Sequence, residues 1–118
     1  MRVITGTARG RVLRTLEGED VRPTTDRVKE AVFSIIQFEI EGRRVLDLFA
    51  GSGQLGIEAL SRGAASATFV DMSKDSLSAV KYNLEHTKLG DNAKVVQTDA
   101  LSFLKLTKDK FDIVFLDP

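Results

Sequence analysis

Four aspartates in this sequence stand where an apolar segment ends: Asp47, Asp71, Asp99 and Asp117. Each preceding segment has the composition of a strand buried on both faces, as in a parallel sheet. Ligands of open parallel sheets bind beyond the carboxyl ends of the strands. A helix cap or a loop role explains any single aspartate equally well. Four at equivalent positions predict a ligand site at that edge of the sheet.

A turn of small residues follows the first of these segments. Residues 45–49 predict the buried strand, and helical spacing begins at Gln54. Between them lie Ala50, Gly51, Ser52 and Gly53. A ligand can approach such a backbone closely, because almost no side chain stands in the way. Unpaired backbone N–H groups and the positive end of the helix then favour an anionic group above the turn.

Two classes of cofactor use this strand, turn and helix. Gly51, Gly53 and Gly56 have the dinucleotide-binding spacing, and Asp71 follows at about the ~20-residue distance of an acid that binds a ribose hydroxyl. Asp47 separates the classes, because a buried carboxylate is costly without a cationic partner. S-adenosylmethionine carries an ammonium, a sulfonium and a carboxylate, so we predict this cofactor. Two alternatives stay open: Asp47 caps a local turn, or the protein is a nicotinamide-dependent oxidoreductase, which leaves the other strand-end aspartates unexplained.

The composition describes one globular domain without cysteine chemistry. The chain has 118 residues, 42% hydrophobic and 29% charged, with a formal net charge of zero, which suits a soluble domain. The absence of cysteine excludes disulfides, thiolate metal sites and cysteine nucleophiles. His86 is the one histidine and has no partner pattern, so no metal is predicted. No apolar run approaches the ~20 residues that span a bilayer, and no signal peptide opens the chain, so a cytoplasmic location is predicted.

Alternating strand and helix patterns place the aspartates and the turn in one sheet. Strands are predicted over residues 45–49, 67–70, 94–97 and 111–116, and helices over 54–62, 73–89 and 100–106. Thr24 or Thr25 caps an earlier helix that runs to about Phe38. Residues 2–4 and 11–16 predict two short strands of a hairpin arm. The fold class is therefore α/β, a Rossmann-like parallel sheet with helices on both faces, with residues 1–22 as a basic arm and 23–118 as the cofactor-binding part.

The arm is rich in arginine. Before the first acidic residue, Glu17, come Arg2, Arg9, Arg11 and Arg14. The planar fork of arginine pairs well with phosphate. Because the run is all arginine and is interleaved with glycines, a nucleic-acid contact is favoured over a solvated basic tail.

The strand-end aspartates and the turn together resemble the motif series of S-adenosylmethionine-dependent amino-methyltransferases. The first motif is the run from Asp47 to Gly53, and the last is Asp117-Pro118, where those enzymes have Asp or Asn, two prolines and an aromatic residue. Residues 9–13 and 22–33 are similar to the RsmD family, bacterial enzymes that methylate a guanine N2 of 16S ribosomal RNA. The resemblance covers essentially the whole chain.

The resemblance implies a role for each matching residue. The methionine part of the cofactor would be held by Asp47 and by the backbone of Ala50, Gly51, Ser52 and Gly53. The ribose and the adenine would be bound by Asp71, Met72, Asp99 and Ala100. The target amine would donate to Asp117, with the Pro118 carbonyl as a second acceptor. The pocket wall would include Thr24, Thr25 and Arg27, and the RNA phosphates would be contacted by Arg2, Arg9, Arg11, Arg14 and Arg22.

The sequence departs from the family pattern at its end. It stops at Pro118, before the second proline, the aromatic residue that would stack on the target base, and the remaining strands. We expect a methyltransferase fragment that keeps the cofactor half and does not complete the reaction. Its fourth strand would be an exposed apolar edge and a site of self-association. An RNA-binding module without catalysis is the alternative, and the modified nucleotide, and whether free RNA or a particle is bound, stay open.

Overall fold

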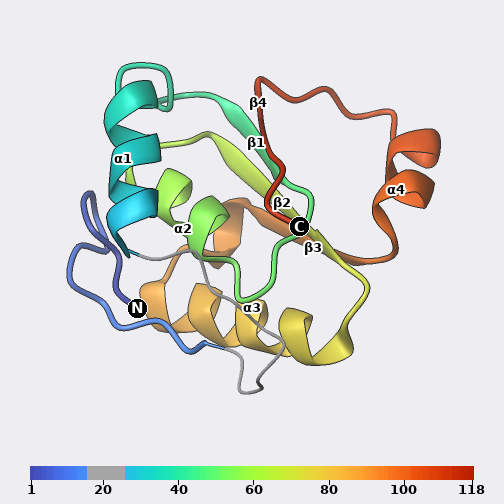
Figure 1. Ribbon diagram of the computed structural model, residues 1–118, viewed down its shortest axis with the longest axis horizontal. Helices are drawn as coiled ribbons and strands as arrows, with labels where there is room; N and C mark the ends of the chain where they lie inside the picture. The colour runs from blue at the N-terminus through green and yellow to red at the C-terminus, as the bar shows by residue number, and fades with distance from the viewer. Residues whose placement is uncertain (16–25) are drawn as a thin grey trace.

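A computed structural model of the chain describes residues 1–15 and 26–118. Helices and strands alternate along it (Figure 1): α1 Asp26–Ile36, β1 Arg44–Asp47, α2 Gln54–Ser61, β2 Ser66–Asp71, α3 Lys74–Thr87, the 3₁₀ turn Gly90–Asn92, β3 Ala93–Gln97, α4 Ala100–Leu106 and β4 Ile113–Phe115. None of the helices in these described ranges is long and apolar enough to cross a membrane. The predicted alternation of strands and helices is confirmed.

The strands form one parallel sheet in the order β3-β2-β1-β4. β1 pairs with β2 on one side and with β4 on the other, which sets Asp47 opposite Phe69 and Phe115. Because every pairing is parallel, all strands end at the same edge and their connections pass through helices. The predicted Rossmann-like α/β class is confirmed, and the predicted ligand edge is formed by the ends of β1 and its two neighbours.

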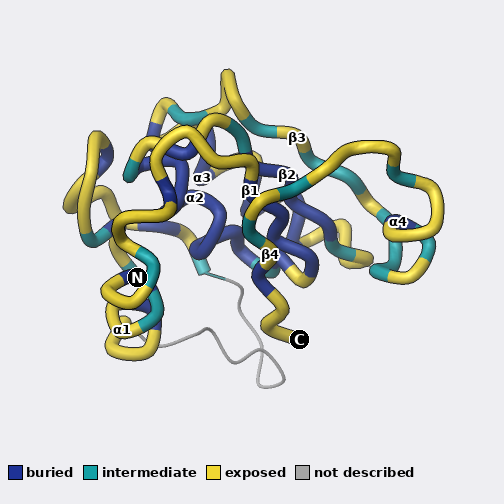
Figure 2. Tube along the Cα trace, turned by 90° about the horizontal axis from the view of Figure 1, so that it is seen from above, coloured by how far each residue is buried: buried dark blue, intermediate teal, exposed yellow. Residues whose placement is uncertain are grey.

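Both faces of the sheet carry helices, because the central strands are apolar on both sides. Val45 and Phe69 face a core shared with α1, α2 and α3. Leu46 and Val70, one residue further along each strand, face a second core with Phe103 of α4. Figure 2 shows that β1 and β2 are buried at the centre, whereas α4 and the loop after it are largely exposed. The predicted ligand edge is therefore carried by the most deeply buried strands of the fold.

Gly56 allows α2 to lie directly on β2. A Cβ atom at position 56 would lie 2.3 Å from Cε1 of Phe69, which is fully buried. We expect Gly56→Ala to lower the free energy of unfolding by about 1–3 kcal/mol, because the ring must move within a close-packed core. Gly90→Ala is the matched control, since its nearest neighbour, Leu84 Cβ, would lie 4.0 Å away. Urea denaturation measures both variants, and equal stabilities would contradict this role of Gly56.

Several element ends differ from the predictions for local reasons. α1 ends at Ile36 rather than Phe38, in a turn where the Glu39 N–H donates to the Ile36 carbonyl. α3 ends at Thr87 rather than Leu89, because Lys88 takes the left-handed conformation, with φ 61°. β4 is shorter than the predicted 111–116, because it pairs with β1 over three positions that end at Asp47.

The predicted hairpin over residues 2–4 and 11–16 is shorter than expected: the Val3 N–H donates to the Arg11 carbonyl at 2.9 Å and the Leu13 N–H to the Met1 carbonyl at 2.8 Å. Within residues 1–15, which we call the N-terminal arm, the two segments meet at a single antiparallel bridge between Arg2 and Val12. Position 16 lies outside the described residues. The N–H groups of Ile4 and Thr5 donate to a side chain of α2 instead of to a partner strand. The arm is therefore a folded segment docked on α2, and its apolar side chains join the main core: Val3, Ala8 and Leu13.

Candidate active site

Three of the four strand-end aspartates come together at the carboxyl edge. Asp47 and Asp71 are the last residues of β1 and β2, and Asp117 follows β4 after one residue. Burial is the main cause that raises the pKa of Asp47 from 3.8 to about 7; the hydrogen bond from Gly56 opposes the rise, and the charges of Asp117 and Asp71 add to it. The edge therefore favours a positively charged group beside Asp47.

Asp47 lies inside the protein, with 1% of its surface exposed. Its Oδ2 atom accepts a hydrogen bond from the Gly56 N–H at 3.1 Å. This contact ties the end of β1 to the first turn of α2, in agreement with the local-cap alternative. A neutral donor does not offset the burial of a carboxylate fully, which is why the pKa stays high. The contact and a cationic ligand are therefore compatible.

The turn after β1 is held by Asp71. Gly51 and Gly53 have φ of 56° and 84°, in the left-handed region that glycine favours. The Gly51 N–H donates to Asp71 Oδ2, and the Ser73 N–H donates to Asp71 Oδ1, each at 2.9 Å. One carboxylate thus joins the turn after β1 to the turn after β2. A Cβ atom on Gly51 would meet no atom of residues 1–15 or 26–118 within 4 Å, so these parts of the chain leave space open beside the turn.

Asp99 caps α4. Its Oδ1 accepts from the Ser102 N–H at 2.8 Å, and its Oδ2 accepts from the Ser102 hydroxyl at 2.7 Å. The backbone hydrogen bond from Ser102 is the main cause that lowers the pKa of Asp99. The alternative that a strand-end aspartate caps a helix is therefore confirmed for Asp99 by its contacts with Ser102. Asp99 follows β3, which β2 separates from β1; nearby, Met72 is exposed and Ala100 is half-buried.

The arginines predicted to contact RNA lie on the surface. Those within the described residues are all exposed: Arg2, Arg9, Arg11 and Arg14. Arg27, which was predicted for the pocket wall, is exposed as well. The guanidinium carbon of Arg14 lies 4.0 Å from the ring centre of Tyr82 on α3, a cation–π contact that directs this side chain along the helix. Pro118 is exposed at the edge of the sheet. Three predicted residues lie outside the described residues: Arg22, Thr24 and Thr25.

A buried ion pair holds the N-terminal arm in place. Glu58 of α2 and Lys29 of α1 are fully buried, with Oε1 and Nζ 3.3 Å apart. Glu58 also accepts the N–H groups of Ile4 and Thr5, at 2.8 and 3.0 Å. Lys29 donates to the Arg2 carbonyl at 2.9 Å, and burial lowers its pKa. The sequence analysis missed this cluster, although a glutamate inside the apolar run of α2 was a signal for it.

Asn83 joins the N-terminal arm to the turn after β1. It is fully buried on α3. Its Oδ1 accepts from the Arg14 N–H at 2.7 Å, and its Nδ2 donates to the carbonyls of Arg14 and Ser52, each at 2.9 Å. The sequence analysis missed this residue as well. The available signal was an amide side chain on the core-facing side of α3, between Val80 and Leu84.

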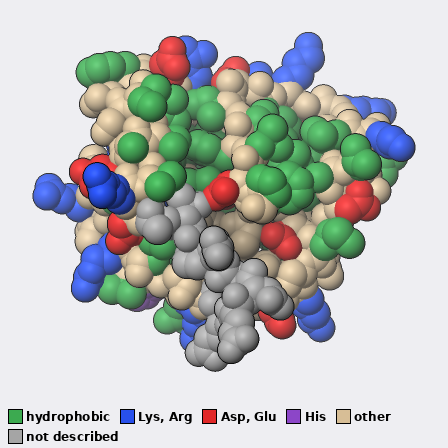
Figure 3. Space-filling model, in the orientation of Figure 1, with side chains coloured by type: hydrophobic (Ala, Val, Ile, Leu, Met, Phe, Trp, Pro, Cys, Tyr) green, Lys and Arg blue, Asp and Glu red, His purple; other side chains and the backbone are tan. Residues whose placement is uncertain are grey.

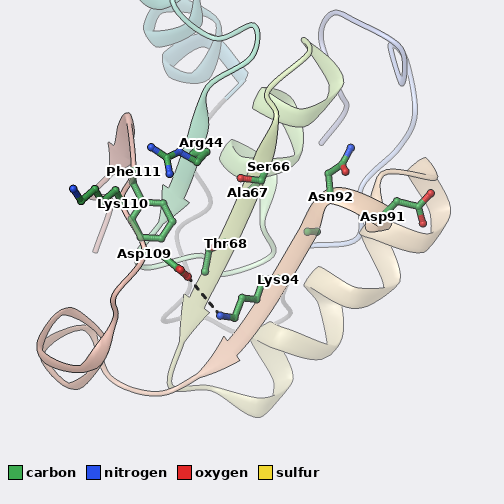
Figure 4. A pocket seen from close by; sticks show the side chains of 11 residues that line it. Arg44, Ser66, Ala67, Thr68, Asp91, Asn92, Lys94, Asp109, Lys110 and Phe111 are labelled. Atoms are coloured by element: carbon green, nitrogen blue, oxygen red, sulfur yellow. Dashed lines mark ion pairs between the residues drawn. The ribbon is translucent and has the colours of Figure 1, made fainter.

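A hollow of about 430 Å³ lies at the opposite end of the sheet. Figure 4 shows Arg44 and Ser66 at the beginnings of β1 and β2, and Lys94 directed at Asp109, with Nζ and Oδ2 3.6 Å apart. Side chains alternate between the two faces of a strand. Ala67 and Phe69 of β2 face the core of α1, α2 and α3, so Thr68 between them faces the side of the sheet that carries α4, and the hollow that it lines lies on that side. None of the strand-end aspartates lines the hollow. The candidate site is therefore the carboxyl edge, where three of these aspartates lie, and not this hollow.

A family model described as Conserved hypothetical protein 95 matches residues 1–118. Ribosomal RNA small subunit methyltransferase D of Haemophilus influenzae is 45% identical over 121 aligned positions, which cover 100% of this chain and 63% of that protein. The solved structure of yhhF from Escherichia coli matches with a TM-score of 0.89 and 46% identity, over 100% of this chain and 64% of that one. A structure from Streptococcus mutans, described as a SAM-dependent methyltransferase, matches with a TM-score of 0.68 and 26% identity, over 75% of this chain and 25% of that one.

The matched relatives are longer than this chain. It spans 59–66% of the length of the first three curated relatives that it matches. The similarity therefore reaches every residue of the chain and the carboxyl edge described above, but only part of each relative.

Proposed function

The chain belongs to the family described as Conserved hypothetical protein 95, the RsmD family, and from this premise we propose that it transfers a methyl group from S-adenosylmethionine to a guanine N2 amine of small-subunit ribosomal RNA. The name of the Haemophilus influenzae relative supports the RNA class. The observation that carries the proposal is the state of Asp47. It is a buried carboxylate with its pKa raised to about 7 beside two further acids, next to an open glycine turn.

The residues of the carboxyl edge fit S-adenosylmethionine. A cation beside Asp47 offsets the cost of its burial, and the start of α2 favours the carboxylate of the same ligand. The methionine part is assigned to Asp47 and residues 50–53, the ribose to Asp71, and the adenine to Met72, Asp99 and Ala100. Each carboxylate oxygen of Asp71 accepts one N–H and retains capacity for another donor. When bound, the cofactor supplies an electrophilic methyl group on its sulfonium.

Asp117 and the carbonyl of Pro118 are assigned to the target amine. The lone pair of a guanine N2 is delocalised into the ring, so acceptors at its protons favour the pyramidal, nucleophilic form. Asp117 is exposed to solvent, and its charge helps to raise the pKa of Asp47. It therefore lies at the solvent side of the carboxyl edge, where an incoming base could reach it. Holding amine and methyl group in line lowers the barrier further, and a paired base has to be exposed or flipped first.

The N-terminal segment is assigned to the RNA. Residues 1–22 form the proposed RNA-contacting arm, and residues 23–118 the cofactor-binding part. The exposed arginines of the arm suit phosphate contacts, which position an RNA without reading its sequence. Because the proposed substrate is ribosomal RNA, we also propose a cytoplasmic location.

Self-association through β4 is a further part of the proposal. β4 is the edge strand of the sheet, and Val114 and Leu116 are 47% and 65% exposed. Figure 3 shows hydrophobic side chains gathered on the face where Figure 1 places β4. An exposed apolar edge favours pairing between copies. Sedimentation velocity at increasing concentration tests this, and a monomer throughout would contradict it.

Calorimetric titration tests the cofactor first. We expect saturable binding of S-adenosylhomocysteine, no binding of NAD, and loss of binding in Asp71→Ala. Binding of NAD alone would contradict the proposal in favour of the oxidoreductase alternative. That alternative depends on the glycine spacing from Gly51 to Gly56. Close packing against Phe69 already accounts for the glycine at position 56, so the spacing does not require a dinucleotide.

The target is tested separately from the cofactor. Because the relatives are longer, this chain is compared with a fusion that adds the remaining part of the Haemophilus influenzae relative. Labelled methyl groups are followed into unmodified small-subunit RNA, which is then digested to nucleosides. Label in N2-methylguanosine is the expected result, and label in any other nucleoside would contradict the proposed target.

A further inference from the structure

Gln54 has a buried oxygen atom without a partner. It is the first residue of α2, directly after Gly53, and only 6% of its surface is exposed. Among the buried side-chain nitrogen and oxygen atoms of the described residues, its Oε1 is the one that has no hydrogen bond. A buried acceptor that forms no hydrogen bond destabilises the fold. Its presence therefore points to a donor that binds there.

The position of Gln54 on α2 indicates where that donor comes from. Gln54 lies one helical turn before Glu58 and two before Ser61, so the three share a face of the helix. Glu58 and Ser61 bind the N-terminal arm, and α1 lies beside this face (Figure 1). Their polar groups are satisfied within the chain. Gln54 stands at the other end of the face, next to the turn at the carboxyl edge.

The chemistry of the turn identifies the donor. The start of α2 and the open backbone beside Gly51 favour a carboxylate. In the methionine part of S-adenosylmethionine, the ammonium is bonded to the same carbon as the carboxylate. A ligand that places its carboxylate at the start of α2 therefore brings its ammonium close to the same turn. An amide oxygen is a suitable acceptor for that ammonium, and the hydrogen bond is charge-assisted.

We propose that the side chain of Gln54 accepts a hydrogen bond from the ammonium group of the cofactor and so selects ligands that carry an amino-acid part. This inference rests on the proposed function. It assigns to Gln54 a binding role in the cofactor site that neither the glycine spacing nor the strand-end aspartates require. It also gives a role to a polar side chain at a buried position where the described residues offer no partner for its oxygen.

Gln54→Met tests the proposal, because methionine has a similar length and no amide oxygen. Two ligands are titrated by calorimetry: S-adenosylhomocysteine, which has the ammonium, and methylthioadenosine, which lacks the amino-acid part. We expect the variant to bind S-adenosylhomocysteine about tenfold more weakly or worse, with unchanged affinity for methylthioadenosine. Without ligand, its thermal midpoint should rise, because the unpaired acceptor is gone. Weaker binding and higher stability together distinguish a ligand contact from a structural role.

Ser61→Ala is the matched control on the same helix face. Ser61 donates to the Thr5 carbonyl at 2.6 Å and accepts from the Ala8 N–H at 3.0 Å, so its loss should lower stability and leave the ratio of the two affinities unchanged. Equal weakening of both ligands by Gln54→Met, or no weakening of either, would overturn the inference. Failure of the unaltered chain to bind S-adenosylhomocysteine would instead overturn the proposed function, and the inference with it.

Discussion

Asp47→Asn is expected to stabilise the chain above about pH 7 and to abolish the pH dependence that Asp47 imposes. The pKa of Asp47 is about 7 in the folded protein and returns to about 3.8 on unfolding. Between these values the folded protein holds a proton that the unfolded chain has released. The free energy of unfolding therefore falls as the pH rises through this range, by about 4 kcal/mol in total. Asparagine keeps an oxygen for the Gly56 N–H and carries no charge, so this loss disappears.

The same substitution should weaken cofactor binding. The proposed site places the ammonium of the ligand near Asp47, and S-adenosylhomocysteine carries this ammonium without the sulfonium. Its binding therefore favours the ionised form of Asp47 and releases a proton below the pKa. We expect the affinity for S-adenosylhomocysteine to rise with pH up to about 7, and to lose this dependence in Asp47→Asn. Calorimetry in buffers of different ionisation enthalpy counts the released protons. Asp75→Asn on the exposed first turn of α3 is the control, and an affinity independent of pH in the unaltered chain would contradict the pairing.

Glu58→Leu is expected to lower the free energy of unfolding by about 3–5 kcal/mol, the effect of removing one partner of a buried ion pair. Lys29 would be left buried and charged, and the N–H groups of Ile4 and Thr5 would lose their acceptor. Joining Glu58→Leu with Lys29→Met removes the buried charge of Lys29 and leaves the charge of Arg62, the second ion-pair partner of Glu58. The double variant should therefore regain part of the loss. Urea denaturation at one pH measures all three proteins.

Lys94→Met provides the control for Glu58→Leu. It removes the ion pair with Asp109, whose side chains are 64% and 56% exposed. Exposed pairs contribute about 0–1 kcal/mol, so this variant should remain close to the unaltered chain. If Glu58→Leu were no more destabilising than Lys94→Met, the ion pair with Lys29 would not be what anchors the arm.

The local parts of the fold and the site were predictable from the sequence. The glycine turn, the cap of α3 at Ser73 and the cap of α4 at Asp99 depend on residues a few positions apart, and all three are present. The parallel order also follows from the alternation of strands and helices. The resemblance to the RsmD family is confirmed by the family match over the whole chain. Sequence patterns whose residues lie within one or two turns of backbone can be interpreted without a structure.

The contacts that hold the N-terminal arm were not predictable in this way. The hairpin prediction assumed that the backbone groups of the arm bind each other. The N–H groups of Val3 and Leu13 do so. Those of Ile4 and Arg14 bind Glu58 and Asn83 instead, at sequence separations of 54 and 69 residues. A polar side chain on a buried helix face indicates that a distant partner exists, but its type does not identify the partner. The roles proposed for Gln54 and Asp117 likewise depend on a ligand that the sequence does not contain.

The long separation between the N-terminal arm and its partners has a consequence for synthesis. Residues 1–15 emerge from the ribosome before α3, and Asn83 follows the arm residue that it binds by 69 positions. At about 5–20 residues per second, the arm waits several seconds for α3. Closing so long a loop is slow compared with forming the helices. The N-terminal arm should therefore complete its docking only after α3 has been made, when Asn83 can bind both Arg14 and the Ser52 carbonyl.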